Sequence, residues 1–493
     1  MNVDLLRVTR KVLEWSCSVV LALYAVFFVY RAMVVVPYPY PVQFIEGALY
    51  YQVVRFVNGG ELYPDINAGP PFLGPVYAPV YPVLMSLIYQ IVGSGYVWGR
   101  LVTFLSAVFS IALLALFVWQ HTRKVGLAAL TSALLAGLGI VYKWGVFYRV
   151  DMLAIAFSMA GFWLIRTHAR PVHLVLAAIL FAAAFYTKQS FMAAPLAAGL
   201  FFLTERSLEL KARLRLAGII FGLWAVIVAA VFVWLNWATG GEFFLHAVVY
   251  KRQPWGWERW ISYAGDLCRF HWPLLTVAVW SAWQARHDTA VRSWVLFGGL
   301  STVGMLFMIG LVGADGNYYL EPLMISAALF SIGLGRAWQQ VNVRLVLFAA
   351  LLTQLILVRH VPQWTDYAVT PTPGVRNWDE SIVAKVQAQE GLVLADDVGW
   401  VVAGNGSPVV DDPMLFADLS RQGVWNDQPL ASLLEKRQVA AIITYVDFAR
   451  DNCGSKDVMY SPRVCTAVRS HYCLAEMIGR LNVYKPNDRS GCK

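Results

Sequence analysis

Long apolar segments are the feature that most constrains the fold of this chain of 493 residues. About eleven segments are apolar enough to be candidate spans of a hydrocarbon core ~30 Å thick. They lie near residues 15–36, 98–119, 125–142, 151–165, 172–186, 191–204, 215–237, 272–283, 294–313, 318–334 and 343–360. Hydrophobic residues make up 58% of the chain and charged residues 14%. We therefore predict a polytopic α-helical membrane protein.

Basic residues flank these segments unevenly and predict their orientation. Lys and Arg are retained in short cytoplasmic loops, which places the N-terminus and the loops near residues 121–124, 286–292 and 336–344 inside. An odd number of spans then puts everything after Pro362 outside the cytoplasmic membrane. The net charge of +9 fits basic inner loops and anionic membrane lipids, and we predict no nucleic-acid partner.

The chain changes character near residue 362. Short apolar runs (GLVLADD, SPVVDD, VAAIITY, RLNVYKP) alternate with segments of helical period (SIVAKVQAQE, PLASLLEKRQ), which is typical of a small α/β domain. We expect a membrane domain over residues 1–361 and a soluble extracytoplasmic α/β domain over residues 362–493. Within the membrane domain, residues 37–97 form a large first extracytoplasmic loop with juxtamembrane helices.

Cysteine usage gives a second indication of compartment. Of the 6 cysteines, four lie in the last stretch of chain: Cys453, Cys465, Cys473 and Cys492. Their spacing lacks the CxxC and paired histidines of a zinc site, so we predict two disulfides formed in an oxidising compartment. All three connectivities remain open, and free structural thiols are the alternative.

The predicted topology gathers polar residues at the extracytoplasmic ends of the spans. They are Glu46, Tyr50 and Asp65 in the first outer loop, Arg149 and Asp151 in VFYRVDML, Lys188 in TKQS, Lys251 and Arg252 in YKRQPWGWERW, and Asn317, Tyr319 and Glu321 in GADGNYYLEP. Charged groups at membrane depth are costly unless paired or wetted, so these residues are candidate functional groups. The structural alternatives are a helix cap or ion pair at Arg149 and Asp151, a snorkelling Lys188, an interfacial aromatic anchor at residues 250–260 and a purely structural Glu321.

Carboxylates and cations on one wet membrane face suit chemistry on an anionic lipid. A carboxylate can take a proton from an acceptor hydroxyl, while Lys and Arg neutralise phosphate on a leaving group. We expect a solvated carboxylate at Glu46. A transporter would place its polar residues near the midplane of two similar halves. We find no P-loop, HExxH, GxSxG or dinucleotide fingerprint in the sequence.

With these motifs the chain resembles the membrane-embedded GT-C glycosyltransferases, in the branch of protein O-mannosyltransferases and aminoarabinose transferases. The resemblance covers most of the chain, including a large first outer loop, a short amphipathic helix before the second span and a soluble C-terminal domain. Glu46 with Tyr50 four positions on resembles the family's acidic motif, in which a carboxylate is the catalytic base. Ile45 precedes the single carboxylate here, where the family has an Asp-Glu pair, and the tyrosine spacing favours the first motif position for Glu46.

Two further segments carry the resemblance. Thr187, Lys188 and Gln189 resemble the family's threonine-lysine pair, whose lysine approaches the lipid phosphate. Arg149 and Asp151 resemble its second acidic site.

The resemblance implies an inverting transferase that moves one sugar from a polyprenyl-phosphate donor to a hydroxyl of a glycan, lipid or protein on the extracytoplasmic face. It implies that Glu46 is the general base and that Asp151 orients Arg149 or the acceptor. It implies that four residues bind the donor phosphate: Lys188, Arg149, Arg252 and Lys251. It implies that five residues bind substrate: Tyr50, Asp65, Asn317, Tyr319 and Glu321. No cofactor is predicted, and a divalent cation stays open because related enzymes differ. The alternative functions are a lipid-linked saccharide transporter or flippase without chemistry, and a noncatalytic scaffold.

Overall fold

The computed structural model describes residues 3–167, 170–358, 370–455 and 458–487, and it divides into two compact units. The first unit comprises residues 1–33, 101–233 and 253–369. The second comprises residues 34–100, 234–252 and 370–493. The first outer loop, assigned above to the membrane domain, thus groups with the C-terminal residues.

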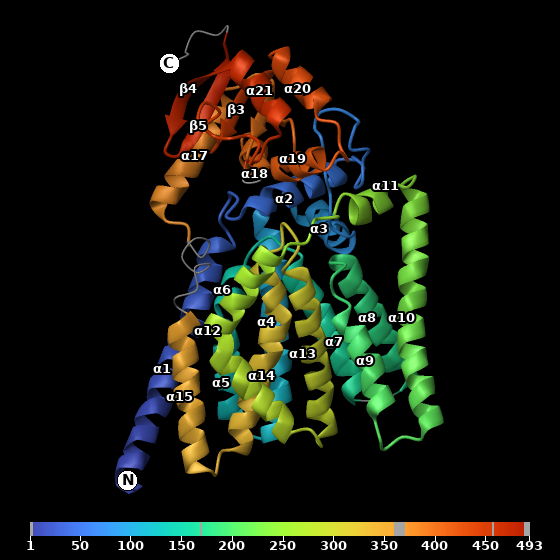
Figure 1. Ribbon diagram of the computed structural model, residues 1–493, viewed down its shortest axis with the longest axis vertical. Helices are drawn as coiled ribbons and strands as arrows, with labels where there is room; N and C mark the ends of the chain where they lie inside the picture. The colour runs from blue at the N-terminus through green and yellow to red at the C-terminus, as the bar shows by residue number, and fades with distance from the viewer. Residues whose placement is uncertain (1–2, 168–169, 359–369, 456–457, 488–493) are drawn as a thin grey trace. The chain divides into compact units, whose positions relative to one another are not determined.

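The first unit is helical (Figure 1). Its helices, two of which run on into the second unit, are α1 (Val3–Val35), α4 (Tyr96–Thr122), α5 (Val125–Gly137), α6 (Gly139–Trp144), α7 (Asp151–Thr167), α8 (Pro171–Thr187), α9 (Ala193–Thr204), α12 (Trp257–Gln284), α13 (Thr289–Met308), the 3₁₀ turn η2 (Gly316–Tyr319), α14 (Leu320–Arg336) and α15 (Val341–Val358). α10 (Leu210–Ala238) also lies mostly in this unit. Each predicted span overlaps at least one of these helices, and the span predicted over residues 125–142 is divided between α5 and α6. Among the described residues, 6 helical stretches are long and apolar enough to cross a membrane, and α5, α7, α8 and α9 are shorter apolar helices.

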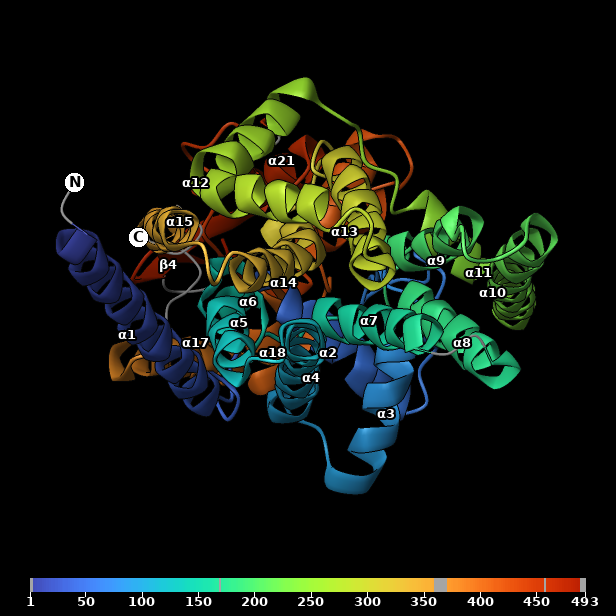
Figure 2. The ribbon, with the colours of Figure 1, turned by 90° about the horizontal axis from the view of Figure 1, so that it is seen from below.

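α14 forms the centre of the first unit. It packs against α5, α12 and α13, as the view along the helices shows (Figure 2). Almost all of its side chains are buried, including its apolar ones on every face. A helix that is apolar all round is expected to lie inside a bundle.

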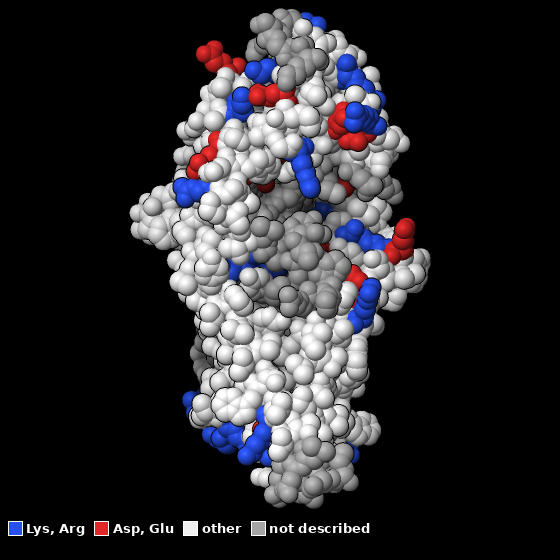
Figure 3. Space-filling view, turned by 90° about the vertical axis from the view of Figure 1, so that its left-hand side faces the viewer, with Lys and Arg blue, Asp and Glu red and all other residues white. Residues whose placement is uncertain are grey.

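The outer helices of the first unit turn apolar side chains outward. On α10, for example, Phe221 and Val226 are 43% and 66% exposed. Figure 3 shows a broad band without charged side chains over the helices of this unit, with Lys and Arg gathered at one end of it. Such a band fits hydrocarbon rather than water. The prediction of a polytopic α-helical membrane protein is confirmed.

α12 is longer than its predicted span because it begins at Trp257 rather than near residue 272. Pro273 lies inside the helix and lacks a backbone N–H. The Gln354 side chain of α15 accepts a hydrogen bond from Leu274 N (3.2 Å) and donates one to Phe270 O (3.0 Å). The Gln354 amide thus bonds the backbone groups of Phe270 and Leu274 on either side of the proline. These bonds account for the tolerance of a proline inside this long helix.

The second unit contains a five-stranded sheet with surrounding helices. The strands are β1 (Leu392–Ala395), β2 (Ser407–Pro408), β3 (Val439–Thr444), β4 (Tyr472–Ile478) and β5 (Leu481–Pro486), in the order β2-β1-β3-β5-β4. β1 is parallel to β2 and β3, and β5 is antiparallel to β3 and β4. The helical elements are α2 (Phe44–Val57), α3 (Val80–Val92), α11 (Glu242–Phe244), the π-helix η1 (Leu245–Val249), α17 (Pro373–Gln387), α18 (Val398–Ala403), α19 (Pro413–Arg421), α20 (Gln428–Glu435) and α21 (Pro462–His471). The predicted α/β domain is confirmed.

The first loop packs directly on this α/β domain. Phe72 N donates to Val409 O (2.8 Å), and Asp411 N donates to Phe72 O (3.1 Å). The Phe72 ring lies against Phe416 and Trp425 in the domain core. Residue 72 therefore extends the sheet beyond its β2 edge.

A buried carboxylate, Asp411, fixes the loop beside this edge. One of its oxygens accepts a hydrogen bond from Gln52 Nε2 of α2 (2.7 Å), and both lie 3.1 Å from the backbone N of Gly74. Burial raises the pKa of Asp411 to about 7. The folded state therefore binds a proton that the unfolded chain releases at a lower pH.

This gives a pH-dependent stability. The raised pKa of Asp411 stabilises the folded state most at low pH, and this stabilisation is lost as pH rises through 7. The free energy of unfolding should fall by about 1 kcal/mol between pH 6 and pH 8. Burial lowers the pKa of His246 to about 4. This shift has the opposite effect on the free energy of unfolding, because it destabilises the folded state below pH 6.5. We expect thermal unfolding of the purified protein to occur at lower temperature at pH 8 than at pH 6, and Asp411→Asn to flatten this difference. If Asp411→Asn kept the same difference in unfolding temperature between pH 6 and pH 8, the pH dependence could not be assigned to Asp411.

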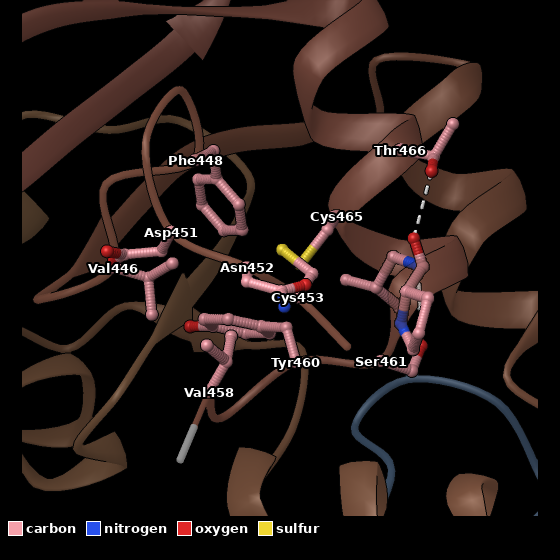
Figure 4. The surroundings of a disulfide bond; sticks show 12 residues. Val446, Phe448, Asp451, Asn452, Cys453, Val458, Tyr460, Ser461, Cys465 and Thr466 are labelled. Carbon is pink, nitrogen blue, oxygen red and sulfur yellow. Dashed lines mark hydrogen bonds between the residues drawn. A yellow bond between two sulfur atoms is a disulfide. The ribbon is translucent and has the colours of Figure 1, made fainter. Parts of the chain in front are cut away.

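One predicted disulfide is present in the second unit. Cys453 and Cys465, separated by 12 positions, are bonded beside Phe448, Val458 and Tyr460 (Figure 4). This selects one of the predicted pairings. Cys492 lies outside the described residues, so the second disulfide stays a prediction.

Candidate active site

Four residues of the first unit gather around one carboxylate, and we call them the Asp151 cluster. They are Arg149, Asp151, Lys188 and Asn317. Asp151 Oδ1 accepts hydrogen bonds from Lys188 Nζ (2.6 Å) and Asn317 Nδ2 (2.8 Å). Its Oδ2 lies 3.5 Å from Arg149 Nε. Sequence reasoning predicted all four as site residues, and the structure brings them together.

Local structure explains how these side chains meet. Asp151 is the first residue of α7, where a carboxylate is favoured by the partial positive charge of the helix N-terminus. Lys188 follows the last residue of α8 in an extended conformation, and α8 packs along α7. Asn317 lies in η2, immediately before α14. The ends of three elements thus converge.

Aromatic rings line the cluster. Lys188 Nζ lies 4.1 Å from the centroid of the Tyr318 ring, and the Arg149 guanidinium lies 5.0 Å from that of Trp144. Lys143 adjoins the cluster because its Nζ lies 5.2 Å from the same Trp144 ring. Rings that face cations stabilise them at a site with little water.

Buried basic side chains gather in this region. Arg149 and Lys188 are 6% and 3% exposed, and Asp151 is the carboxylate between them at 1%. Lys143 is 2% exposed, and its carboxylate partner Asp315 lies 3.9 Å away with a side chain that is 35% exposed. Three buried basic side chains therefore lie near Asp151 in this region. Lys and Arg side chains are the usual protein partners of an anionic ligand such as a phosphate.

The start of α12 holds the loop that carries Asn317. The indole N–H groups of Trp255 and Trp260 donate to the carbonyls of Phe307 and Leu306 at the end of α13 (2.9 and 2.8 Å). Arg259 donates to Ala314 O in the following loop. These bonds satisfy helix-end carbonyls and fix the path of the chain into η2.

Other predicted residues of the first unit have different partners. Tyr319 Oη donates to Tyr263 O (2.7 Å), and Glu321 Oε2 accepts from Ser301 Oγ (2.6 Å). Both side chains are buried at 4% and 6% exposure. These contacts agree with the structural role considered for Glu321, and a substrate role for either residue stays a prediction.

Glu46 lies in the second unit, in the first turn of α2, and forms a buried ion pair with Arg100. Glu46 Oε1 accepts from Arg100 Nε (3.2 Å), and Oε2 accepts from Arg100 Nη2 (2.7 Å) and Val42 N (2.8 Å). Both side chains are 0% exposed. The sequence suggested a solvated carboxylate, whereas the structure encloses it.

Arg100 organises the chain before α2. Besides the two bonds to Glu46, it donates to the carbonyls of Val35, Tyr38 and Tyr40 at 3.0, 2.5 and 2.7 Å. These bonds use the full donor capacity of a guanidinium. Arg100 and Lys143 were both missed from sequence. The available signal was the same as for Arg149, a basic residue close to the end of an apolar segment.

The remaining predicted residues lie elsewhere in the second unit. The Tyr50 ring stacks on Tyr96 with centroids 4.3 Å apart. Asp65 is exposed, and its Oδ1 accepts a hydrogen bond from Asn67 N (2.9 Å) in a local turn. Lys251 Nζ lies 5.5 Å from the Tyr77 ring, and Arg252 is exposed.

No group of three or more His, Cys, Asp or Glu side chains that could hold a metal ion occurs within the described residues. A divalent-cation requirement is therefore left to experiment.

Known proteins resemble this chain in structure. The sequence matches no family model and no curated protein sequence. ArnT from Cupriavidus metallidurans bound to undecaprenyl phosphate superposes with a TM-score of 0.64, over 96% of this chain and 98% of that chain, at 15% identity. The oligosaccharyltransferase AglB from Archaeoglobus fulgidus, in complex with an inhibitory peptide and a dolichol-phosphate, gives a TM-score of 0.55 over 96% and 74% of the two chains, at 10% identity.

The chain therefore has the membrane-embedded GT-C fold, as its sequence predicted. Within that class it is similar to ArnT, an aminoarabinose transferase, along nearly the whole of both chains. Identity this low establishes the fold, and the chemistry must be argued from the residues of this chain.

Proposed function

We propose that the protein is a membrane glycosyltransferase that moves one sugar from a polyprenyl-phosphate donor to a hydroxyl of a glycan, lipid or protein. The observation that carries this proposal is the convergence of three buried basic side chains, Lys188, Arg149 and Lys143, around Asp151 and Trp144. The undecaprenyl phosphate and dolichol-phosphate in the structures of ArnT and AglB support a lipid-phosphate ligand for this fold.

In the proposed reaction the bond between the sugar C1 and the phosphate oxygen breaks, and a bond from C1 to the acceptor oxygen forms. The leaving lipid phosphate gains negative charge, which Lys188, Arg149 and Lys143 offset. Asp151 holds Lys188 and Arg149 in position through its two oxygens. Attack from the face opposite the leaving group inverts the anomeric configuration.

Glu46 is the proposed general base, which takes the proton from the acceptor hydroxyl. Its ion pair with Arg100 occupies both carboxylate oxygens. A base role therefore requires Glu46 to exchange one bond from Arg100 or Val42 for the acceptor hydroxyl. Donor-phosphate binding by Lys251 and Arg252 belongs to the same proposal. So does substrate binding by five residues: Tyr50, Asp65, Asn317, Tyr319 and Glu321.

The test is turnover of detergent-purified protein with short-chain polyprenyl-phosphate sugars and a panel of glycan, lipid A and peptide acceptors. We expect stoichiometric release of polyprenyl phosphate and an acceptor glycoside of inverted configuration by NMR. Parallel reactions with EDTA, Mg²⁺ and Mn²⁺ decide whether a divalent cation is needed. Absence of transfer, together with movement of the lipid-linked sugar across proteoliposomes, would instead identify a flippase.

Orientation is a separate prediction. Because basic loops and clustered cysteines have independent physical origins, we expect the N-terminus inside and Lys493 outside the cytoplasmic membrane. Alkaline phosphatase fused after Lys493 should be active and a fluorescent protein that folds only in the cytoplasm should be dark. The reverse pattern would overturn the topology and place the candidate site on the cytoplasmic face.

A further inference from the structure

Two glycines bring α2 and α18 into close contact within the second unit. Gly47 directly follows Glu46 in α2, and a Cβ atom there would overlap Asp397 Oδ1 and lie 2.5 Å from Gly399 N. A Cβ atom on Gly399 would lie 2.9 Å from both Asp397 Oδ1 and Pro41 Cγ and would overlap Tyr96 Oη. Real Cβ atoms do not approach other atoms so closely.

The reason for these glycines is space rather than backbone freedom. Neither Gly47 nor Gly399 has a positive φ angle, so alanine would be tolerated by both backbones. At Gly47 the atoms met include the backbone of α18, which cannot move aside as a side chain can, whereas at Gly399 they belong to the side chains of Tyr96, Asp397 and Pro41. We call this contact the glycine seat.

Asp397 completes the glycine seat from the C-terminal domain. It is the N-cap of α18, and its Oδ1 accepts a hydrogen bond from Gly399 N (2.8 Å). Burial and nearby carboxylates, Glu46 among them, raise the pKa of Asp397 well above its usual range.

A second contact holds the other end of the same segment. Tyr38 Oη donates to Asp379 of α17, whose other oxygen accepts from Trp400 Nε1 of α18 (2.9 Å). The segment from Tyr38 to Gly47 is thus bound to α17 and α18 at both ends. Arg100 gathers the carbonyls and the Glu46 carboxylate between these ends.

We propose that Gly399 and Asp397 of the C-terminal domain are positioning residues for Glu46, acting through Gly47 and α2. This rests on the proposed function, in which Glu46 accepts the proton of the acceptor. The C-terminal domain then serves catalysis by fixing the place of a side chain in the first outer loop. This role differs from binding of the donor phosphate, which the proposed function assigns to other residues.

The test compares Gly399→Ala and Gly47→Ala with Gly374→Ala. Gly374 lies in α17 of the same unit, and a Cβ there would meet only Thr372 Oγ1 at 3.8 Å. We expect kcat to fall about 10²-fold in the two seat variants, because displacements near 1 Å cost this much, while the donor KM stays within twofold. The control should stay within threefold of wild type in both constants.

A rescue separates positioning from general damage to the fold. Tyr96→Phe removes the hydroxyl that the new Cβ of Gly399→Ala would overlap, so the double variant should recover at least fivefold in kcat, relative to Tyr96→Phe alone. Hydrogen exchange of residues 44–57 should quicken in Gly399→Ala and slow again in the double variant.

Three outcomes decide the matter. If the wild type transfers sugar and both seat variants match Gly374→Ala, the positioning role is wrong while the proposed function stands. If the wild type transfers no sugar, the proposed function fails. In that case the hydrogen exchange of residues 44–57 in Gly399→Ala still tests the glycine seat. Unchanged exchange would overturn it, and faster exchange would support a structural coupling between α18 and α2.

Discussion

Glu46→Gln is expected to lower turnover by about 10² to 10⁴, the usual cost of losing a general base. The amide keeps the shape of the side chain but cannot take the acceptor proton. It also leaves Arg100 buried without a counter-charge, and breaking such a pair typically costs about 3 to 5 kcal/mol of stability. Both effects must therefore be measured, as turnover well below the unfolding temperature and as the unfolding temperature itself.

A matched control and a binding assay separate the two effects. Glu380→Gln removes an exposed carboxylate of the same unit that pairs with Arg376, so turnover and stability should stay near wild type. Donor binding to folded Glu46→Gln should also stay near wild type, because Glu46 is not among the proposed phosphate ligands. Near wild-type turnover of Glu46→Gln would transfer the base role to Asp65, Asp151 or another group.

Lys188→Ala is expected to raise the donor KM and to lower kcat together. A charge-assisted hydrogen bond to phosphate contributes about 1.5 to 3 kcal/mol, or roughly a 10- to 100-fold loss of donor affinity. Because the leaving phosphate gains charge in the transition state, kcat should fall as well. Asp151 keeps Arg149 and Asn317 as partners, so the fold should survive.

Two comparisons sharpen this prediction. Lys385→Ala removes an exposed lysine that pairs with Glu476, and both constants should stay unchanged. Lys143→Ala should raise the donor KM in the same direction as Lys188→Ala. If the double variant Lys143→Ala/Lys188→Ala bound donor as wild type does, the phosphate site would lie elsewhere.

Local patterns in the sequence were enough to find the Asp151 cluster. Arg149, Asp151 and Lys188 each stand at an end of an apolar run, and basic inner loops assign those ends to one face. The helices themselves followed from hydropathy. Lys143 directly follows the span predicted over residues 125–142 and was missed. The structure has two helices there, α5 and α6, and Lys143 lies in α6.

Contacts between distant segments could not be predicted in this way. Arg100 meets Glu46 across 54 positions, and Gln52 meets Asp411 across 359. Neither pair leaves a local pattern, since a buried polar residue differs from a solvated one only by partners that the fold supplies. β4 was also missed, because its residues YCLAEMI lack the alternation or continuous apolar run that marked the other strands.

The extension of the sheet by Phe72 has a consequence for biosynthesis. The first loop leaves the ribosome long before its partner, since Gln52 and Asp411 are 359 positions apart. At 5–20 residues per second this delay is roughly 20 to 70 s. During that time the apolar side of α2 and the Phe72 side chain have no α/β domain to pack against. The apolar residues of the first loop are therefore without this partner until translation is nearly complete.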